Sequence, residues 1–155
     1  MRLPSLPSRP WKIYLDACCL NRLTDDQSQS RIHQEAQAVE KVLAGVQRGI
    51  VALISSEALW EEVRRNPRME RRIEAEAILS LAASIVEIDT SIAFRARSLV
   101  ALGYGPFDAL HVGAAEAAGV DVMMTTDDRL IRRVGRAVGQ PRIPVLNPLS
   151  WLEER

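Results

Sequence analysis

The chain has 155 residues, of which 47% are hydrophobic and 26% charged, which is the size and composition of one ordinary globular domain. This composition excludes a disordered chain. No apolar run approaches the roughly 20 residues that a membrane span needs, which excludes the transmembrane class. Twenty basic residues balance twenty acidic ones, so any nucleic-acid site must be local rather than a property of the net charge.

Residues 1–10 contain three prolines and two arginines but no continuous apolar stretch. They do not resemble a secretory signal, and we expect them to form a leader to a single domain over residues 11–155. The only two cysteines, Cys18 and Cys19, are adjacent, which disfavours a mutual disulfide and leaves no spacing for a zinc site. A reducing, cytoplasmic location without membrane contact is therefore expected.

Short apolar runs alternate with segments of helical periodicity after the leader. Strands are predicted at 12–16, 50–54, 85–88, 120–125 and 143–146, and helices at 31–48, from 55 to about 66, from there to about 83, from 89 to about 101, at 107–118, 126–136 and 148–153. Strands that alternate with helices in this way predict an α/β fold, with a central parallel sheet of about four or five strands covered by helices on both faces.

Carboxylates collect where such a fold binds ligands, at the carboxyl ends of its strands. One acid ends the first predicted strand, three lie on the helix after the second, one begins the helix before the fourth, and two follow the fourth: Asp16, then Glu57, Glu61 and Glu62, then Asp108, then Asp127 and Asp128. No Ser/His/Asp triad or Cys/His pair occupies comparable positions, although His111 lies one helical turn after Asp108. The predicted site is therefore acidic.

Several carboxylates in one cleft repel each other unless a hard cation neutralises them or they take up protons. Mg²⁺ and Mn²⁺ prefer oxygen ligands and are often completed by substrate phosphates, so the pattern favours phosphoryl transfer or phosphodiester hydrolysis. Receiver domains and haloacid-dehalogenase-type phosphatases are disfavoured, because both need a lysine in the second half of the chain and none follows Lys41. No glycine-rich phosphate loop is present in the sequence either.

Three segments in this order and spacing resemble the PIN-domain proteins, the metal-dependent ribonuclease fold common among VapC-type toxins of toxin–antitoxin pairs. The segments are 14–22 (YLDACCLNR), 107–111 (FDALH) and 124–130 (MTTDDRL). The resemblance implies a three-layer α/β/α fold and an Mg²⁺ or Mn²⁺ site of Asp16, Glu62, Asp108 and Asp127 that activates water to cleave RNA, leaving a 5′-phosphate and a 3′-hydroxyl. It also implies a homodimer and a small antitoxin whose tail enters the acidic cleft.

Two details of this assignment have alternatives. Glu62 is favoured because residues 59–67 (LWEEVRRNP) resemble the family's Leu-x-x-Glu segment and its Asn-Pro stop, with Glu61 second and Glu57 also open. Cys18 stands where many relatives have Ser, Thr or Asn, which predicts either a weaker hydrogen bond behind the site or transfer of that role to Asn21.

Other polar residues have structural interpretations. We expect Asp128 to be only a helix-start acid, His111 to be a buried or hydrogen-bonded helix residue rather than a general base, and Glu116 to be exposed. Two arginine clusters are either RNA contacts or solvated helix faces without an interleaved aromatic for base stacking: Arg64, Arg65, Arg68, Arg71 and Arg72, and Arg129, Arg132, Arg133 and Arg136. A PIN-like nucleic-acid-binding or scaffold module without catalysis, and a metal-dependent nuclease outside any toxin system, are the alternative functions.

Overall fold

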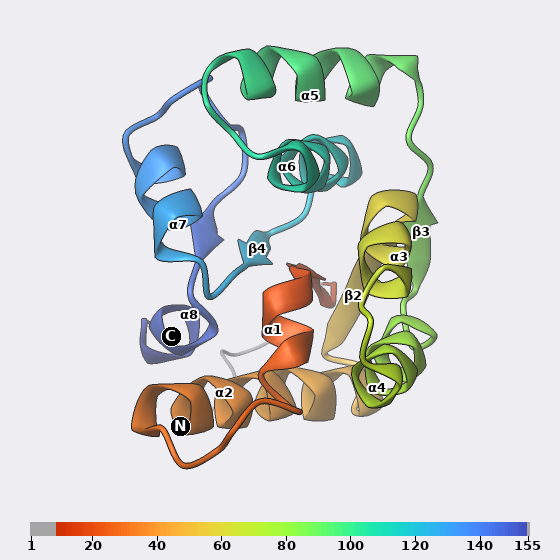
Figure 1. Ribbon diagram of the computed structural model, residues 1–155, viewed down its shortest axis with the longest axis vertical. Helices are drawn as coiled ribbons and strands as arrows, with labels where there is room; N and C mark the ends of the chain where they lie inside the picture. Colours follow the sequence, from red (N-terminus) through yellow and green to blue (C-terminus); the bar gives the residue numbers. More distant parts are fainter. Residues whose placement is uncertain (1–8, 155) are drawn as a thin grey trace.

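The computed structural model describes residues 9–154, which form a parallel sheet with helices around it (Figure 1). The strands are β1 (Trp11–Leu15), β2 (Val51–Ser56), β3 (Ser84–Val86), β4 (Val122–Met124) and β5 (Val145–Leu146). The helices are α1 (Ala17–Asn21), α2 (Ser30–Gln47), α3 (Glu57–Arg64), α4 (Met69–Leu79), α5 (Thr90–Ala101), α6 (Pro106–Ala118), α7 (Asp128–Gly135) and α8 (Pro148–Glu153). Within residues 9–154, no helix is both long and apolar enough to cross a membrane.

The sheet has the strand order β3-β2-β1-β4-β5, and every neighbouring pair is parallel. Strand β1 lies at the centre, where Tyr14 is in register with Ile54 on one side and Met123 on the other. The chain adds strands first on the β2 side and later on the β4 side, so the strand order reverses at β1. Such a reversal opens a crevice beyond the carboxyl end of the central strand, and Asp16 is the first residue there.

Helices cover both faces of the sheet and give it three layers. On one face, helix α6 packs against β2 and β3 and carries α5 on its outer side. On the other face, helix α2 packs against β2 and against α8 (Figure 1). The central strand is correspondingly apolar on both faces, with Ile13, Tyr14 and Leu15 fully buried. The predicted α/β/α fold with a central parallel sheet of about four or five strands is confirmed, and the sheet has five strands.

Helix α6 shows how the sequence sets an element's ends and its packing distance. Pro106 begins the helix, and Gly119 ends it with a left-handed φ of 62°. A Cβ added to Gly113 would approach the Ile92 side chain to 3.2 Å, so this glycine permits the close contact between α5 and α6. The same helix carries Asp108 in its first turn.

Several local expectations differ from the structure. Helix α1, which begins directly after Asp16, was not among the predicted helices. Strand β3 ends at Val86 rather than at residue 88 and leaves Ile85 exposed, because it pairs with β2 alone at the sheet edge. The side chain of Glu116 is buried rather than exposed: it is 1% accessible and forms ion pairs with two arginines. Most of the predicted leader, residues 1–8, lies outside the described residues.

Candidate active site

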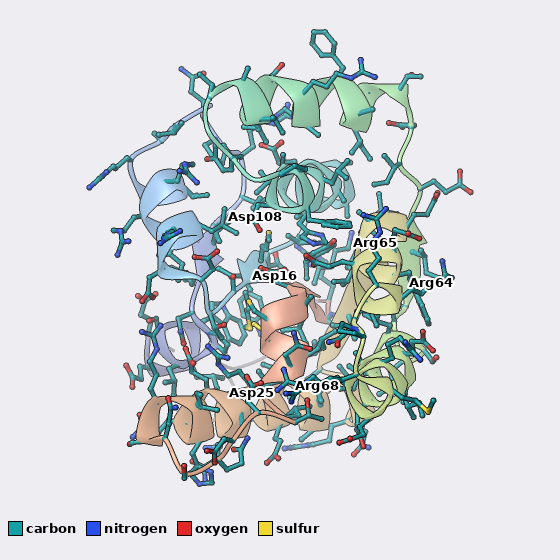
Figure 2. The ribbon with its side chains drawn as sticks, in the orientation of Figure 1. Asp16, Asp25, Arg64, Arg65, Arg68 and Asp108 are labelled. Carbon is teal, nitrogen blue, oxygen red and sulfur yellow. The ribbon has the colours of Figure 1, made fainter. Side chains whose placement is uncertain are left out.

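The four acids predicted from the sequence line one cavity of about 430 Å³ at the carboxyl end of β1. Each comes from a different element: Asp16 follows β1, Glu62 lies on α3, Asp108 lies in the first turn of α6, and Asp127 precedes α7. Figure 2 places Asp16 and Asp108 close to the centre of the molecule. The parallel sheet therefore brings together acids that are far apart in the sequence.

Asp16 is 5% exposed, and both of its carboxylate oxygens accept hydrogen bonds. Its Oδ1 accepts from the backbone N–H of Ala17 at 2.8 Å, which begins α1. Its Oδ2 accepts from the hydroxyl of Thr125 at 2.9 Å and lies 3.4 Å from the thiol of Cys18. A buried carboxylate is costly unless it is compensated in this way, so the surrounding residues fix the orientation of Asp16.

A closed chain of hydrogen bonds holds Glu62. Its Oε1 lies 2.9 Å from Nε2 of His111, whose Nδ1 lies 2.6 Å from the hydroxyl of Tyr14. That hydroxyl lies 2.7 Å from Oγ of Ser56, and Ser56 caps the same helix that carries Glu62. Because a carboxylate only accepts hydrogen bonds, Nε2 of His111 carries the hydrogen toward Glu62. This series of hydrogen bonds joins residues of β1, α3 and α6 next to the cavity.

His111 and Asp108 both have perturbed pKa values. Burial lowers the pKa of His111, but the hydrogen bond to Glu62 and the charges of nearby acids outweigh this effect, so the net pKa is raised. Burial is also the largest cause for Asp108, whose pKa rises to about 6, with the negative charges of Asp16, Asp127 and Glu62 adding to it and His111 opposing it. The cavity thus carries more negative charge than its own cations compensate.

The donor set suits a hard divalent cation. Ligand atoms of Asp16, Glu62 and His111 all lie within 4.8 Å of one another, and these residues are the group of three that the described part of the chain offers to a metal. Asp108 and Asp127 line the same cavity outside this group. The imidazole directs an N–H at Glu62, so the available ligands are carboxylate oxygens, which Mg²⁺ and Mn²⁺ prefer.

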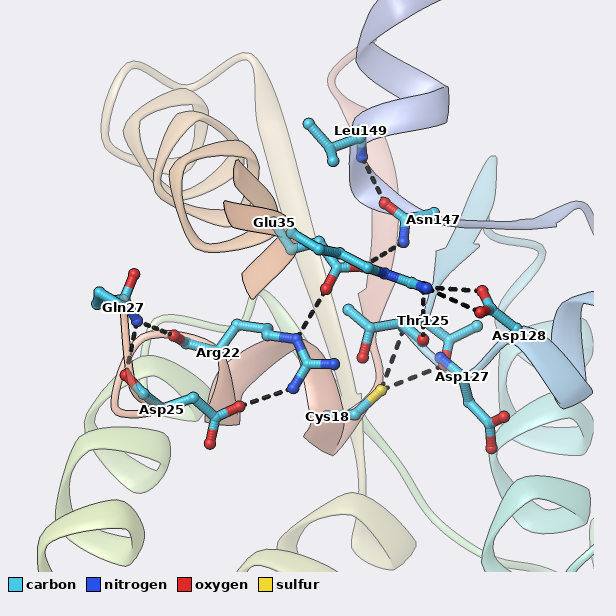
Figure 3. A network of polar contacts seen from close by, with 12 residues as sticks. Cys18, Arg22, Asp25, Gln27, Glu35, Thr125, Asp127, Asp128, Asn147 and Leu149 are labelled. Carbon is cyan, nitrogen blue, oxygen red and sulfur yellow. Dashed lines mark hydrogen bonds and ion pairs between the residues drawn. The ribbon is translucent and has the colours of Figure 1, made fainter. Parts of the chain in front are cut away.

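Thr125 connects two of the acids. Besides donating to Asp16, its hydroxyl oxygen accepts from the backbone N–H of Asp127 at 3.1 Å. The Cys18 thiol lies 3.2 Å from the same hydroxyl and accepts from the N–H of Thr126 at 3.2 Å, as Figure 3 shows. Cys18 thus takes part in the contacts behind Asp16.

Asp127 and Asp128 differ in their surroundings. Asp127 caps α7 by accepting from the backbone N–H of Arg129 at 2.9 Å, and it also lines the cavity. Asp128 is 51% exposed and forms a two-bond ion pair with Arg31, at 2.8 and 2.9 Å. Asp128 is therefore a first-turn residue held by α2, whereas Asp127 combines a capping contact with a place at the cavity.

Of the three candidate glutamates, only Glu62 lines the acidic cavity. Glu61 is 48% exposed and pairs with Arg64 and Arg65 on the surface of α3. Glu57 accepts from the backbone N–H of Ile88 at 3.3 Å and lines a separate cavity. Glu61 and Glu62 are adjacent on the helix, so their side chains point in directions about 100° apart around the helix axis.

The fold also brings aromatic rings to the arginines of α3. Although no aromatic residue is interleaved with this cluster in the sequence, Cζ of Arg65 lies 5.4 Å from the ring centroid of Phe107, and Cζ of Arg64 lies 5.7 Å from that of Trp60. Arg65, Arg71 and Phe107 line the same cavity as the four acids. The aromatic neighbour of Arg65 therefore comes from α6, a segment distant in the sequence.

Comparison with known proteins identifies the family of this chain. The PIN domain matches residues 13–137, which is most of the chain. Among curated proteins, none matches this sequence. Three similar solved structures are FitAcB of Neisseria gonorrhoeae (17% identity, 88% of this chain and 98% of that one, TM-score 0.53), a VapC toxin of Mycobacterium tuberculosis that cleaves the sarcin-ricin loop (14%, 76% and 92%, 0.56), and DNA-bound VapBC of Salmonella typhimurium (19%, 89% and 98%, 0.54). At these identities they show a shared fold.

Proposed function

Because the chain belongs to the PIN domain family, we propose that it is a divalent-metal-dependent endoribonuclease that hydrolyses RNA phosphodiester bonds, as the toxin of a type II toxin–antitoxin pair. One observation carries the proposal: four carboxylates from four elements line a single cavity of about 430 Å³. Their charges help to raise the pKa of Asp108 to about 6, and a divalent cation relieves this repulsion.

Asp16, Glu62, Asp108 and Asp127 would hold Mg²⁺ or Mn²⁺, and the ion, when bound, supplies an activated water and stabilises the leaving oxygen. The protein's part is to preorganise these ligands. The Thr125 hydroxyl and the Ala17 N–H fix Asp16, and the imidazole of His111 fixes Glu62. Hydrolysis in which water attacks the phosphorus and the bond to the 3′-oxygen breaks would leave a 5′-phosphate and a 3′-hydroxyl, the products that the family resemblance implies.

RNA as the substrate is supported by two observations. One structurally similar protein is a toxin that cleaves the sarcin-ricin loop. In this chain, Arg65 at the rim of the acidic cavity supplies positive charge for a neighbouring phosphate, although the net charge of the chain is zero. Local charge therefore replaces a bulk positive field.

The partners we propose are a cognate antitoxin and a second copy of the chain. Similar solved structures include VapBC and FitAB toxin–antitoxin complexes, which supports an antitoxin as the partner. The entry of its tail into the acidic cavity is proposed from the family resemblance alone. Both cysteines are free thiols, which suits a reducing cytoplasm.

Cleavage of an RNA panel tests the function. Purified protein is incubated with single-stranded and structured RNAs, and with matching DNAs, in Mg²⁺, Mn²⁺ or EDTA. We expect metal-dependent RNA cleavage that Asp16→Asn and Asp108→Asn abolish and that Asp128→Asn, an exposed acid paired with Arg31, retains. Cleavage that survives in EDTA or in both cavity variants contradicts the four-acid site. A folded protein that neither cleaves nor binds Mn²⁺ supports the binding or scaffold module instead, and cleavage of DNA as fast as RNA supports a nuclease outside a toxin system.

A further inference from the structure

Helix α7 and its C-terminal cap carry an arginine cluster that the proposed function does not use. The members of this α7 cluster are Arg129, Arg132, Arg133 and Arg136. At 3.6 residues per turn, their side chains fall within an arc of about 100° on one side of the helix. On the other side, Leu130 is fully buried, and Ile131 and Val134 pack against the core. The apolar side therefore fixes the helix, and the arginine side faces away from the core.

The charge of the α7 cluster is not compensated by the protein. Among residues 9–154, no carboxylate forms an ion pair with any of the four guanidinium groups. Asp128 begins the same helix, but its carboxylate is bonded to Arg31 at 2.8 and 2.9 Å, and Arg132 only helps to lower its pKa. The negative end of a helix dipole amounts to about half a charge, which offsets little of the four. A positive surface therefore remains on a chain of zero net charge.

A buried tyrosine organises the α7 cluster. Tyr104 is 2% exposed, and its hydroxyl donates to the backbone carbonyl of Val138 at 2.7 Å. The guanidinium of Arg133 lies over the same ring, 5.4 Å from Cζ to the centroid. Between them, Ala137 has a left-handed φ of 57°, a conformation that a non-glycine residue keeps only where its surroundings hold it. Tyr104 thus fixes both Arg133 and the segment that follows the helix.

The α7 cluster and Val138 line a hollow of about 230 Å³ outside the acidic cavity. The two sites share no lining residue, but α7 connects them, because Asp127 both lines the acidic cavity and caps this helix. Arg132 and Arg136 follow Asp127 by about 8 and 14 Å along the helix axis, at about 1.5 Å per residue. In Figure 1, α7 lies at the left beside β4, whereas α3 lies at the right beside β2.

We propose that the α7 cluster is a second binding site for the RNA substrate, which holds backbone phosphates of the strand where it extends beyond the acidic cavity. The inference rests on the proposed ribonuclease function and adds a site remote from the bond that is cleaved. A guanidinium group donates two parallel hydrogen bonds to a phosphate. Contacts of this kind bind without regard to base sequence and set the position of the strand.

Phosphates suit this hollow better than an acidic protein segment does. Four arginines surround one apolar residue, Val138. A docked protein segment usually buries apolar side chains at the centre of its interface, and this hollow offers little surface for them. A nucleic-acid strand presents successive charges at its surface and needs no such contact.

Binding is measured by fluorescence anisotropy with labelled single-stranded RNA of about 16 nucleotides, in the Asp16→Asn background. We expect Arg132→Gln and Arg136→Gln together to weaken binding about tenfold. The slope of log K against log salt should fall by about 1.4, since each phosphate contact on a single strand contributes about 0.7. Arg132→Lys and Arg136→Lys together should keep most of the slope, because both charges remain. An unchanged affinity and slope in the glutamine pair overturn the site.

Two arginines elsewhere provide a control with the same change in net charge. Arg48 caps the C-terminus of α2, Arg97 lies on α5, and both are exposed. Arg48→Gln and Arg97→Gln together should leave RNA binding nearly unchanged, and urea unfolding verifies that both pairs of variants are folded. Equal losses in the two pairs mean that only net charge matters and overturn the site. Loss of oligoglutamate binding in the α7 pair, with RNA binding intact, assigns the cluster to an acidic protein segment and also overturns it.

Cleavage kinetics separate this site from the acids. With the acidic cavity unmodified, the α7 pair Arg132→Gln and Arg136→Gln should raise KM for RNA about tenfold and leave kcat unchanged, because a remote contact binds substrate and transition state equally. A fall in kcat without a rise in KM contradicts a remote binding site. Anisotropy judges the α7 cluster even if the protein cleaves no RNA, and metal-dependent cleavage judges the ribonuclease function even if RNA binding does not depend on α7.

Discussion

Nε2 of His111 lies 2.9 Å from Oε1 of Glu62, so a fully buried imidazole on α6 holds a carboxylate on α3. The hydrogen on Nε2 occupies the lone-pair direction that a metal ligand would need. His111 therefore positions a ligand rather than serving as one, even though ligand atoms of Asp16, Glu62 and His111 all lie within 4.8 Å of one another.

Removing this hydrogen bond should weaken metal binding without abolishing it. We expect His111→Leu to reduce Mn²⁺ affinity about tenfold to a hundredfold, because Glu62 loses its orientation, and His111→Gln to recover part of the loss through its amide donor. Calorimetric titration with Mn²⁺ measures the effect. His33→Leu, at the other histidine of the chain, which is exposed on α2, is the control. Loss of binding as complete as in Asp16→Asn would instead make His111 a ligand.

The raised pKa of Asp108 gives a pH-dependent stability in the metal-free protein. The unfolded chain releases this proton near pH 4, whereas the folded protein holds it until about pH 6. Between these values the folded state binds more protons, so this group's contribution to the free energy of unfolding is present below pH 4 and is lost as the pH rises through 6. Asp108→Asn removes this loss, so its stability relative to the unmodified protein should increase from pH 4 to 6 and then level off in urea unfolding curves recorded in EDTA.

Asp128→Asn is the opposite case. The hydrogen bonds to Arg31 lower the pKa of Asp128, so its contribution is present above the unfolded value and declines as the pH falls through the folded one. For Asp108, the contradicting result is a stability difference between Asp108→Asn and the unmodified protein that does not change between pH 4 and 6. Such a result would mean that the pKa of Asp108 is not raised.

The sequence predicted what depends on local pattern and on the general geometry of parallel sheets. Apolar runs located all five strands, and Pro106 and Gly119 located the ends of α6. The convergence of Asp16, Asp108 and Asp127 followed because carboxyl ends of parallel strands share one edge. Strand ends were less accurate, since an edge strand such as β3 has pairing on one side alone.

Contacts between distant segments could not be predicted from the sequence. Helix α1 has five residues, too few for a periodic pattern, and it begins because Asp16 caps it. The hydrogen bonds of His111 to Tyr14 and Glu62 join three elements, so no spacing along the chain indicates them. Phe107 meets Arg65 only because α6 packs beside α3. Composition likewise could not reveal that the Glu116 side chain is buried between Arg95 and Arg142.

The fully buried carboxylate of Glu35 should be important for stability. It accepts from Nε of Arg22 at 2.8 Å, from Nε of Arg31 at 3.3 Å and from the side-chain amide of Asn147, which joins α2 to the chain before α8 (Figure 3). Glu35→Ala leaves these donors without their buried acceptor and should cost about 3 kcal/mol of unfolding free energy in urea titrations. Glu40→Ala, on the exposed face of the same helix, should cost less than about 0.5 kcal/mol. Equal costs would mean that solvent compensates the arginines.

Thr125 should couple two acids of the cavity through one hydroxyl. Oγ1 donates to Oδ2 of Asp16 at 2.9 Å and accepts from the N–H of Asp127 at 3.1 Å, so Thr125→Val removes both contacts while keeping the side-chain shape. We expect Mn²⁺ affinity to fall about tenfold or more in calorimetric titrations, and Thr125→Ser to restore most of it because the hydroxyl returns.

The neighbouring change Thr126→Val separates this coupling from a general loss of packing behind the cavity. Both threonines are buried, but the Thr125 hydroxyl is the one hydrogen bonded to Asp16. Urea unfolding of each variant identifies any affinity change that comes from partial unfolding. If Thr125→Val and Thr126→Val weaken Mn²⁺ binding equally while both remain folded, the hydroxyl does not orient Asp16. A loss confined to Thr125→Val and reversed by Thr125→Ser means that the acid must be held by this hydrogen bond before the cation binds.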